Sequence, residues 1–183
     1  MGLFNKIKNV FSKDKEAAKY EEGLTKTRKE FSTELAKLSK KYKNIDDDYP
    51  PTPREVLKLY SDITVCFYSE DYTDEELTQL ALQIEKLYDE ELIANNTPDQ
   101  YQKNLRWDIK TMKDKNLRVT SYSVASATDV DYFDAGGRSW ARLSCTYTIR
   151  SGKEAGLARE IFLLRKDDMG HWKIYGWGAA KER

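Results

Sequence analysis

The stretch from Ser139 to Arg150, SWARLSCTYTIR, decides the fold, because its apolar and polar side chains alternate. A period of two is typical of a β-strand that buries one face and exposes the other. The residues that we expect to face the core are Ala141, Leu143, Cys145, Tyr147 and Ile149.

Three further stretches in the C-terminal half are predicted to be strands. Residues 117–128 (LRVTSYSVASAT) are β-branched and small, and residues 157–165 and 171–178 are also rich in strand-forming side chains. The sequence Asp167-Asp168-Met169-Gly170 is typical of a tight turn between the last two. We therefore expect a curved, four-stranded antiparallel sheet.

Three helices are predicted ahead of this sheet. The first covers residues 54–69, and the second covers residues 73–93 with Thr73 as its N-cap and Glu76 completing a capping box. Thr97 precedes the third, with Pro98 in the first helical position. Helices followed by an antiparallel meander predict an α+β domain. The inward face of the first helix is expected to contain Val56, Leu57, Tyr60, Ile63, Thr64 and Phe67.

The net charge of zero conceals a division of charge along the chain. Residues 1–43 hold 12 Lys and Arg against 6 Asp and Glu, whereas residues 44–183 hold 19 against 25. A basic arm on an acidic body is typical of an arm that meets an anionic surface, either a membrane or a nucleic acid.

Residues 2–11, GLFNKIKNVF, predict a short amphipathic helix with a basic side and an apolar side. Such a helix suits the interface of an anionic bilayer, and its apolar side is not needed to contact phosphates, so nucleic acid is not expected as a partner. The alternative is that this helix docks on the core of the body. The predicted membrane contacts are Leu3, Phe4, Lys6, Ile7, Lys8, Val10 and Phe11.

A longer helix with one narrow apolar stripe is predicted over residues 15–43, and the prolines at 50, 51 and 53 form a stiff linker after it. This division predicts a basic amphipathic segment over residues 1–49, a Pro-rich linker over 50–53 and an α+β domain over 54–183. The stripe consists of Tyr20, Leu24, Phe31, Leu35, Leu38 and Tyr42.

Residues 1–49 resemble the N-terminus of the bacterial signal recognition particle receptor through MGLFNKIKNVF, GLTKTRKEF and KNIDDDY, in that order. In that family the region contributes to docking at the membrane and at the ribosome side, which the resemblance implies here for Leu3, Phe4, Ile7, Phe11 and the lysines around them. The resemblance ends at Tyr49. The chain has no GxxxxGK[ST] phosphate loop, so GTP hydrolysis is not expected.

The body, residues 53–180, resembles an NTF2-like domain, a cone in which a curved sheet wraps around helices, and it also resembles small uncharacterised Firmicutes proteins. The resemblance rests on LYSDITVCFYS, LYDEELIANNTPDQY and GHWKIYGWG. The order departs from the usual scheme of that fold, because all three helices precede the sheet and the early hairpin is missing. The fold hosts enzymes, scaffolds and ligand binders, so it does not imply a function.

Aromatic side chains supply the candidate surface for a partner or a small apolar ligand. Alternation along the last strand sends Trp172 and Ile174 to one face and Tyr175 and Trp177 to the other. The alternative is that these rings fill the core between the sheet and the helices. The candidate surface residues are Trp140, Arg142, Trp172, Tyr175 and Trp177.

Other residues with chemical potential have simpler interpretations. Cys66 and Cys145 fit no metal or redox spacing and are predicted to be buried thiols. His171, beside a turn, is predicted to be exposed or packed at an edge, with a general base as the alternative. The group Asp129, Asp131 and Asp134 is predicted to be a solvated hairpin turn rather than a cation site.

Taken together, these observations predict a non-enzymatic, peripheral membrane binding or adaptor module in the cytoplasm, at the inner face of the cell membrane, with a link to protein targeting. No metal or cofactor is expected, and no catalytic residue is identified. Two alternatives stay open: a small pocket enzyme of the NTF2-like kind, which needs a carboxylate or His171 in an apolar interior, and a structural homodimer.

Overall fold

The structure, a computed structural model, describes residue 45 and residues 48–180. The segment 3–11, for which membrane contact is predicted, and the striped helix over 15–43 lie outside these residues. Within the described part, four α-helices come first: α3 (Pro53–Ser69), α4 (Asp74–Glu85), α5 (Glu90–Asn95) and α6 (Pro98–Asp114). Thr73 and Glu76 form the predicted capping box at the start of α4.

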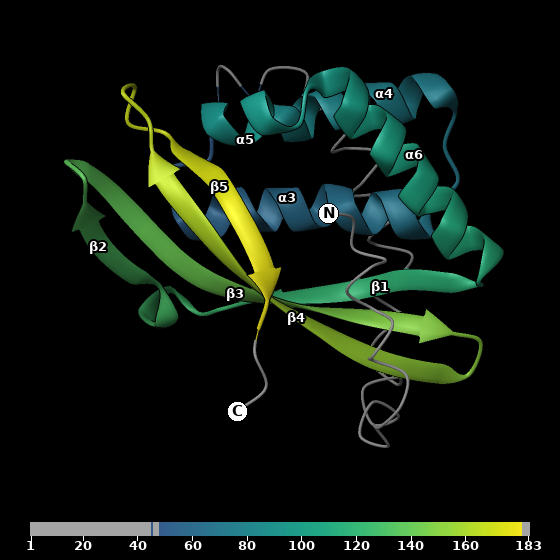
Figure 1. Ribbon diagram of the computed structural model, residues 1–183. Helices are drawn as coiled ribbons and strands as arrows, with labels where there is room; N and C mark the ends of the chain where they lie inside the picture. Colours follow the sequence, from purple (N-terminus) through teal and green to yellow (C-terminus); the bar gives the residue numbers. More distant parts are fainter. Residues whose placement is uncertain (1–44, 46–47, 181–183) are drawn as a thin grey trace.

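The strands that follow are antiparallel and form one sheet, which confirms the α+β class (Figure 1). They are β1 (Leu117–Val124), β2 (Asp131–Ala135), β3 (Arg138–Ser151), β4 (Glu154–Lys166) and β5 (Trp172–Ala179), in the order β1-β3-β4-β5. β1 and β2 pair with successive parts of the same edge of β3, and the short 3-10 helix η4 (Ala127–Asp129) lies between them.

The prediction of four strands was therefore wrong by one strand. Asp131 and Asp134, predicted to lie in a hairpin turn, are in β2, and the turn itself is made by Gly136 and Gly137, both with positive φ. Every residue of β2 is exposed. A strand that buries neither face has no alternation of apolar and polar residues, and the polar composition of this segment resembles that of a turn.

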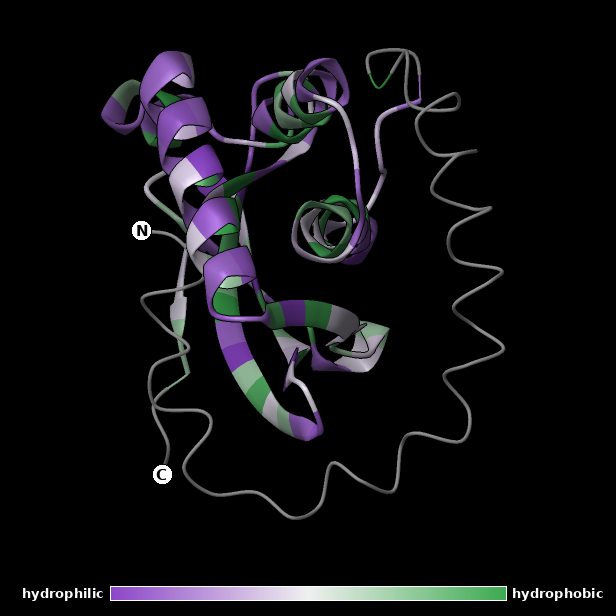
Figure 2. Ribbon diagram, turned by 90° about the vertical axis from the view of Figure 1, so that its right-hand side faces the viewer, coloured by the Kyte–Doolittle hydropathy of each residue, from purple (hydrophilic) through white to green (hydrophobic). Residues whose placement is uncertain are grey.

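The alternation along β3 is confirmed, because all five residues predicted to face the core are buried. The inward face predicted for the first helix, now α3, is buried as well. α3 packs against β1, β3 and β5, so that this helix and the sheet enclose the core. Figure 2, in which α3 is seen end-on, shows the helix on the concave side of the curved sheet, and Figure 1 shows α4 and α6 above it.

The helix predicted over residues 73–93 is divided into α4 and α5. Between them the chain runs along the edge of β5: the backbone N–H of Asp89 donates to the carbonyl of Ile174 (2.9 Å), and the N–H of Ile174 donates to the carbonyl of Leu87 (2.7 Å). Pairing with the sheet outweighs the helical propensity of this stretch. Asp89 then caps α5 by accepting a hydrogen bond from the N–H of Glu91 (3.0 Å).

The first described residues join the body beside the start of β5. Ile45 is buried in the core. The Tyr49 hydroxyl donates to the Trp172 carbonyl (2.8 Å), and its ring lies 4.4 Å from the ring of His171. The Nζ of Lys173 lies 4.3 Å from the centroid of the Tyr49 ring. Tyr49 therefore fixes the start of the described chain at one end of this strand.

Candidate functional site

The face of the sheet opposite α3 carries a strip of apolar side chains that are only partly buried. Trp140 on β3 points to this side, because its neighbour Ala141 points to the core. Arg142 and Ser144 lie on the same side of β3. Their partners on β4 are Leu163 and Ile161, respectively. Antiparallel partners point to the same side of a sheet. We call this group the outer strip: Phe133, Trp140, Ile161, Leu163 and Tyr175.

The aromatic members of the outer strip contact one another. The rings of Phe133 and Trp140, which are direct cross-strand partners, stack at 6.3 Å with 7° between their planes. The Tyr175 ring meets the Trp140 ring edge-on at 5.0 Å. Phe133 remains 40% exposed, so the rings cover one another only in part. A partly exposed aromatic group of this kind is typical of a binding surface.

Arg165 lies under the two larger rings and fixes their positions. Its guanidinium is 5.0 Å from the centroid of the Tyr175 ring and 5.6 Å from that of Trp140. It donates to both carboxylate oxygens of Asp89 (2.6 and 2.9 Å) and to Glu91 (2.7 Å). Arg165 and Asp89 are both buried. Such a bidentate pair is geometrically specific, so we expect this end of the strip to be rigid.

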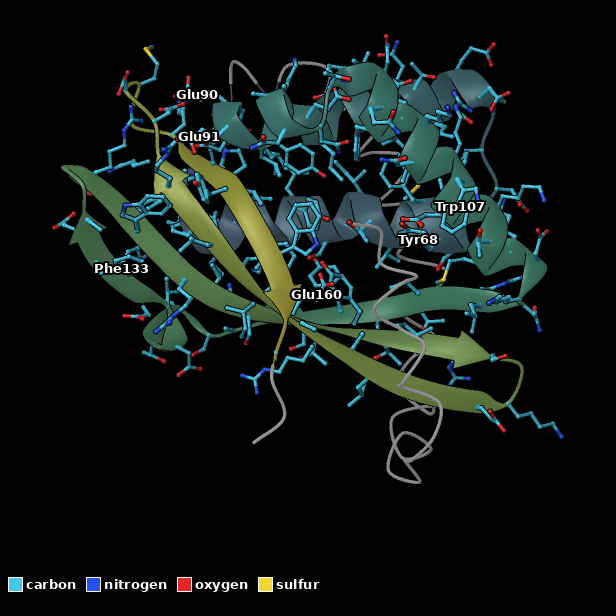
Figure 3. All side chains as sticks on the ribbon, in the orientation of Figure 1. Tyr68, Glu90, Glu91, Trp107, Phe133 and Glu160 are labelled. Atoms are coloured by element: carbon cyan, nitrogen blue, oxygen red, sulfur yellow. The ribbon has the colours of Figure 1, made fainter. Side chains whose placement is uncertain are left out.

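The acidic start of α5 borders the same end of the strip. The Tyr175 hydroxyl donates to Glu91 (2.9 Å), and this bond, together with the stronger one from Arg165, lowers the pKa of the Glu91 carboxyl. Glu90 is more exposed and lies 3.8 Å from Arg165. Figure 3 shows Glu90 and Glu91 next to β4 and β5, with Phe133 farther away on β2. Carboxylates therefore lie beside aromatic rings at this end.

Three of the five residues predicted for the partner surface, Trp140, Arg142 and Tyr175, lie on this outer face. Arg142 forms an exposed ion pair with Asp131 on β2 (2.6 Å). Trp172 and Trp177 do not belong to it. Trp172 is buried, and Trp177 stacks on the core ring of Phe162 (5.8 Å).

The placement of Trp177 on the Tyr175 face was wrong because β5 contains a bulge. Leu164 pairs with Ile174 and Leu163 pairs with Gly176, so Tyr175 is an extra residue opposite β4. A bulge shifts the alternation by one residue. Ile174 and Trp177 therefore both face the core, whereas Tyr175 reaches the outer face.

A second group of polar side chains lies between the helices and the sheet, on the opposite side from the outer strip. Asp108 on α6 is 5% exposed, Glu160 on β4 is 2% exposed, and Tyr68 on α3 is also buried. Burial raises the pKa of Asp108 to about 6. The pKa of Tyr68 is raised mainly by burial, and the charges of Asp108 and Glu160 add to this effect. Figure 3 shows Tyr68 and Glu160 on the helix-facing side of the sheet.

These interior acids were missed by sequence reasoning, although a signal for each was present. Glu160 lies between Ala158 and Phe162 at the inward positions of β4, and Asp108 lies between Leu105 and Met112 on the buried face of α6. Both positions follow from the periodicity. Other hydroxyl groups of this interior come from Tyr60, Ser61, Tyr88, Tyr101 and Tyr147.

The remaining candidates have structural roles. Both cysteines are buried, as predicted, and burial raises the pKa of Cys66 to about 12 and that of Cys145 to about 11. His171 packs at the edge beside Tyr49, and its Nδ1 lies 3.6 Å from a carboxylate oxygen of Asp167. Among the described residues, no three His, Cys, Asp or Glu side chains are placed to hold a metal ion.

Comparison with known families assigns the chain to a family. A family model described as a domain of unknown function, DUF6715, matches residues 7–177. The chain belongs to the DUF6715 family. The DUF6715 match begins within the basic arm and ends at Trp177, so it includes the outer strip and the interior acids. No curated protein matches the chain.

None of the described helices of this DUF6715 protein is both long enough and apolar enough to cross a bilayer.

Proposed function

We propose that this DUF6715 protein is a non-enzymatic binding module that works at an anionic membrane surface, in the cytoplasm at the inner face of the cell membrane. The body binds a protein partner or a small apolar ligand through the outer strip. The observation that carries this proposal is the contact of Phe133, Trp140 and Tyr175 on the face of the sheet opposite α3. Large rings that are left partly exposed are typical of a binding surface.

The basic arm supplies the attraction to lipid in this proposal. Residues 1–43 carry a net charge of +6, and each lysine near an anionic surface contributes about 1 kcal/mol. Insertion of Phe4 and Phe11 into the headgroup boundary adds an apolar contribution. The resemblance of residues 1–49 to the signal recognition particle receptor supports a link to protein targeting.

We also propose that the body has the NTF2-like cone. The curved sheet with α3 on its concave side supports this assignment (Figure 2). The order of elements differs from the usual scheme, because all the described α-helices precede the strands.

Sedimentation with vesicles tests the membrane part of the proposal. The full chain and a chain lacking residues 1–11 are each mixed with vesicles of equal parts phosphatidylglycerol and phosphatidylcholine, and with phosphatidylcholine alone. We expect only the full chain to sediment, and only with the anionic vesicles. A matched variant, Lys6→Gln with Lys8→Gln, keeps the apolar side and separates charge from insertion. Equal sedimentation of the full and shortened chains contradicts the proposal.

The interior acids favour one alternative, an enzyme that uses acid–base chemistry. A general acid or base works best with a pKa near the operating pH, and the pKa of Asp108 is raised to about 6. Tyr68 and Glu160 lie on the same interior. With a ligand in this interior, Asp108 would exchange a proton with it.

Access and titration test this alternative. A water-soluble carbodiimide with a small amine labels carboxyl groups that small molecules reach, and mass spectrometry identifies them. An acid–base site predicts labelling of Asp108 and titration of its side chain near pH 6 in NMR spectra. An Asp108 that takes no label in the native chain and titrates near pH 4 eliminates this alternative. Labelling of the exposed Asp168 is the internal control.

A further inference from the structure

We propose that the outer strip is the resting site of the chain's own N-terminal segment, residues 3–11, and that this segment leaves the strip when it binds lipid. The inference rests on the membrane-binding arm of the proposed function and adds an intramolecular competitor to it. Four observations carry it: the open surface of the strip, the chemistry of the segment, the position at which the arm joins the body, and the length of the chain between the two.

The strip is open along β5 because glycines face it there. Gly176 pairs with Leu163, and Gly178 pairs with Ile161, so both glycines lie on the outer face beside apolar side chains. A Cβ atom added at either glycine would meet nothing within 4 Å. Ile161 and Leu163, which are partly exposed, border this open space, and Trp140 and Tyr175 lie at one end of it.

The segment has the complementary chemistry. Its predicted helix has apolar residues on one side, and the nearby lysines Lys6 and Lys8 carry positive charge. At the aromatic end of the strip, Arg165 is already paired with the buried carboxylate of Asp89. The carboxylates of Glu90 and Glu91 lie at the same end and are more exposed. They are suitable partners for the lysines.

The arm joins the body close to the strip. Tyr49 contacts Trp172 and Lys173 at the start of β5, the strand that contains Tyr175, Gly176 and Gly178. Residues 12–44 would span roughly 50 Å as a helix and about twice that when extended, which is more than a small domain requires. A tether that can reach the strip favours docking on the same chain over docking on a second copy.

Docking on the strip and binding to lipid use the same apolar side chains, so each excludes the other. When a fraction of the chains holds the segment on the strip, the apparent affinity for vesicles falls in proportion to the free fraction. For a docked fraction of about nine-tenths, release of the segment raises the vesicle affinity roughly tenfold. The strip becomes free for a partner at the same time.

Paramagnetic relaxation in the full chain locates the segment. A spin label is attached to Asn9→Cys, because Cys66 and Cys145 are buried. We expect the amide signals of Leu163, Gly176 and Gly178 to broaden, and those around Trp107, exposed on α6, to remain sharp. Anionic vesicles are expected to remove the broadening at the strip. Retention of sharp signals at the strip overturns the proposal.

A mixture of two samples identifies the occupant. One sample is spin-labelled and carries no isotope, and the other is isotope-labelled and carries no spin label. If the segment docks on its own chain, the spin label never lies near an isotope-labelled strip, so the proposal predicts that the mixture shows no broadening. Broadening that persists shows that the segment of a second copy occupies the strip and overturns the intramolecular site.

Two variants connect docking with lipid binding. Gly178→Arg places a charged side chain in the strip, at a position where an added Cβ atom meets nothing within 4 Å. The control, Leu157→Arg, places the same charge at an exposed position at the other end of β4. We expect Gly178→Arg to remove the broadening and raise the affinity for anionic vesicles by up to about tenfold, and Leu157→Arg to do neither. Unchanged vesicle affinity in Gly178→Arg contradicts the competition. Absence of vesicle binding in every variant instead contradicts the proposed membrane function, whatever the spin label reports.

Discussion

Tyr175 and Trp177, two residues apart on β5, face opposite sides of the sheet. The bulge at Tyr175 produces this reversal, because Leu163 and Leu164 of β4 pair with Gly176 and Ile174. Trp177 therefore packs on Phe162 and Tyr88 in the core, whereas Tyr175 contacts Trp140 and Arg165 on the outer face. The extra residue in β5 thus allows Trp177 to pack on the core while Tyr175 joins the outer strip.

The first prediction tests this reversal. Trp177→Ala removes a partly buried ring that packs on the core, and it is expected to lower the free energy of unfolding by about 3 kcal/mol. Tyr175→Ala, the matched variant on the outer face, is expected to lower it by less than about 2 kcal/mol. Urea unfolding measures both values. Equal losses in the two variants would contradict the opposite orientations.

The second prediction concerns the ion pair under the strip. Arg165→Met leaves the buried carboxylate of Asp89 without its cation, and we expect the free energy of unfolding to fall by about 3–5 kcal/mol. Arg142→Met breaks the exposed pair with Asp131 and serves as the control, with an expected loss below about 1 kcal/mol. Urea unfolding at neutral pH compares them. A loss in Arg165→Met no larger than in the control would show that the pair does not stabilise the body.

The third prediction follows from the raised pKa of Asp108. The folded chain holds the proton of Asp108 up to about pH 6, whereas the unfolded chain releases it near pH 4. The folded state therefore binds more protons between these values, and the contribution of Asp108 to stability decreases as the pH rises from about 4 to 6. Asp108→Asn is expected to flatten this decrease and to stabilise the fold at pH 7 by roughly 1–2 kcal/mol. Unfolding measured from pH 4 to 7 in both chains decides the matter, and parallel curves would refute the prediction.

The fourth prediction concerns the thiols. Burial raises the pKa of Cys66 to about 12 and that of Cys145 to about 11, so neither is a thiolate near pH 8. We expect a colorimetric disulfide reagent to leave both cysteines unmodified in the native chain and to modify both in urea. The two reactions are followed by absorbance. Rapid modification of either thiol in the native chain would show that it is accessible.

The residues that sequence reasoning placed correctly are those whose surroundings are local or periodic. The inward side of β3 followed from alternation, and the capping box of Thr73 and Glu76 followed from spacing. The exposed strand β2 has no such pattern. The bulge at Tyr175 adds one residue without breaking the apolar character of β5, so strict alternation placed Trp177 on the wrong face.

The centre of the candidate site depends on contacts that are distant in sequence. Arg165 and Asp89 are separated by 76 residues, and they meet because residues 87–89 leave the helical path and pair with β5. The sequence around Asp89 indicates a helix rather than an edge contact. The periodicity of β3 predicted that Trp140 and Arg142 share a face, but it did not indicate that Arg165 supports Trp140.

Insertion of Phe4 into lipid tests the central claim most directly. An environment-sensitive fluorophore is attached to Phe4→Cys in the full chain, and its emission is measured as vesicles of equal parts phosphatidylglycerol and phosphatidylcholine are added. We predict a shift to shorter wavelength and a rise in intensity, which are abolished by high salt because the attraction of the lysines is screened. Emission that remains as it is in water at saturating lipid would contradict the claim that this segment brings the body to a membrane.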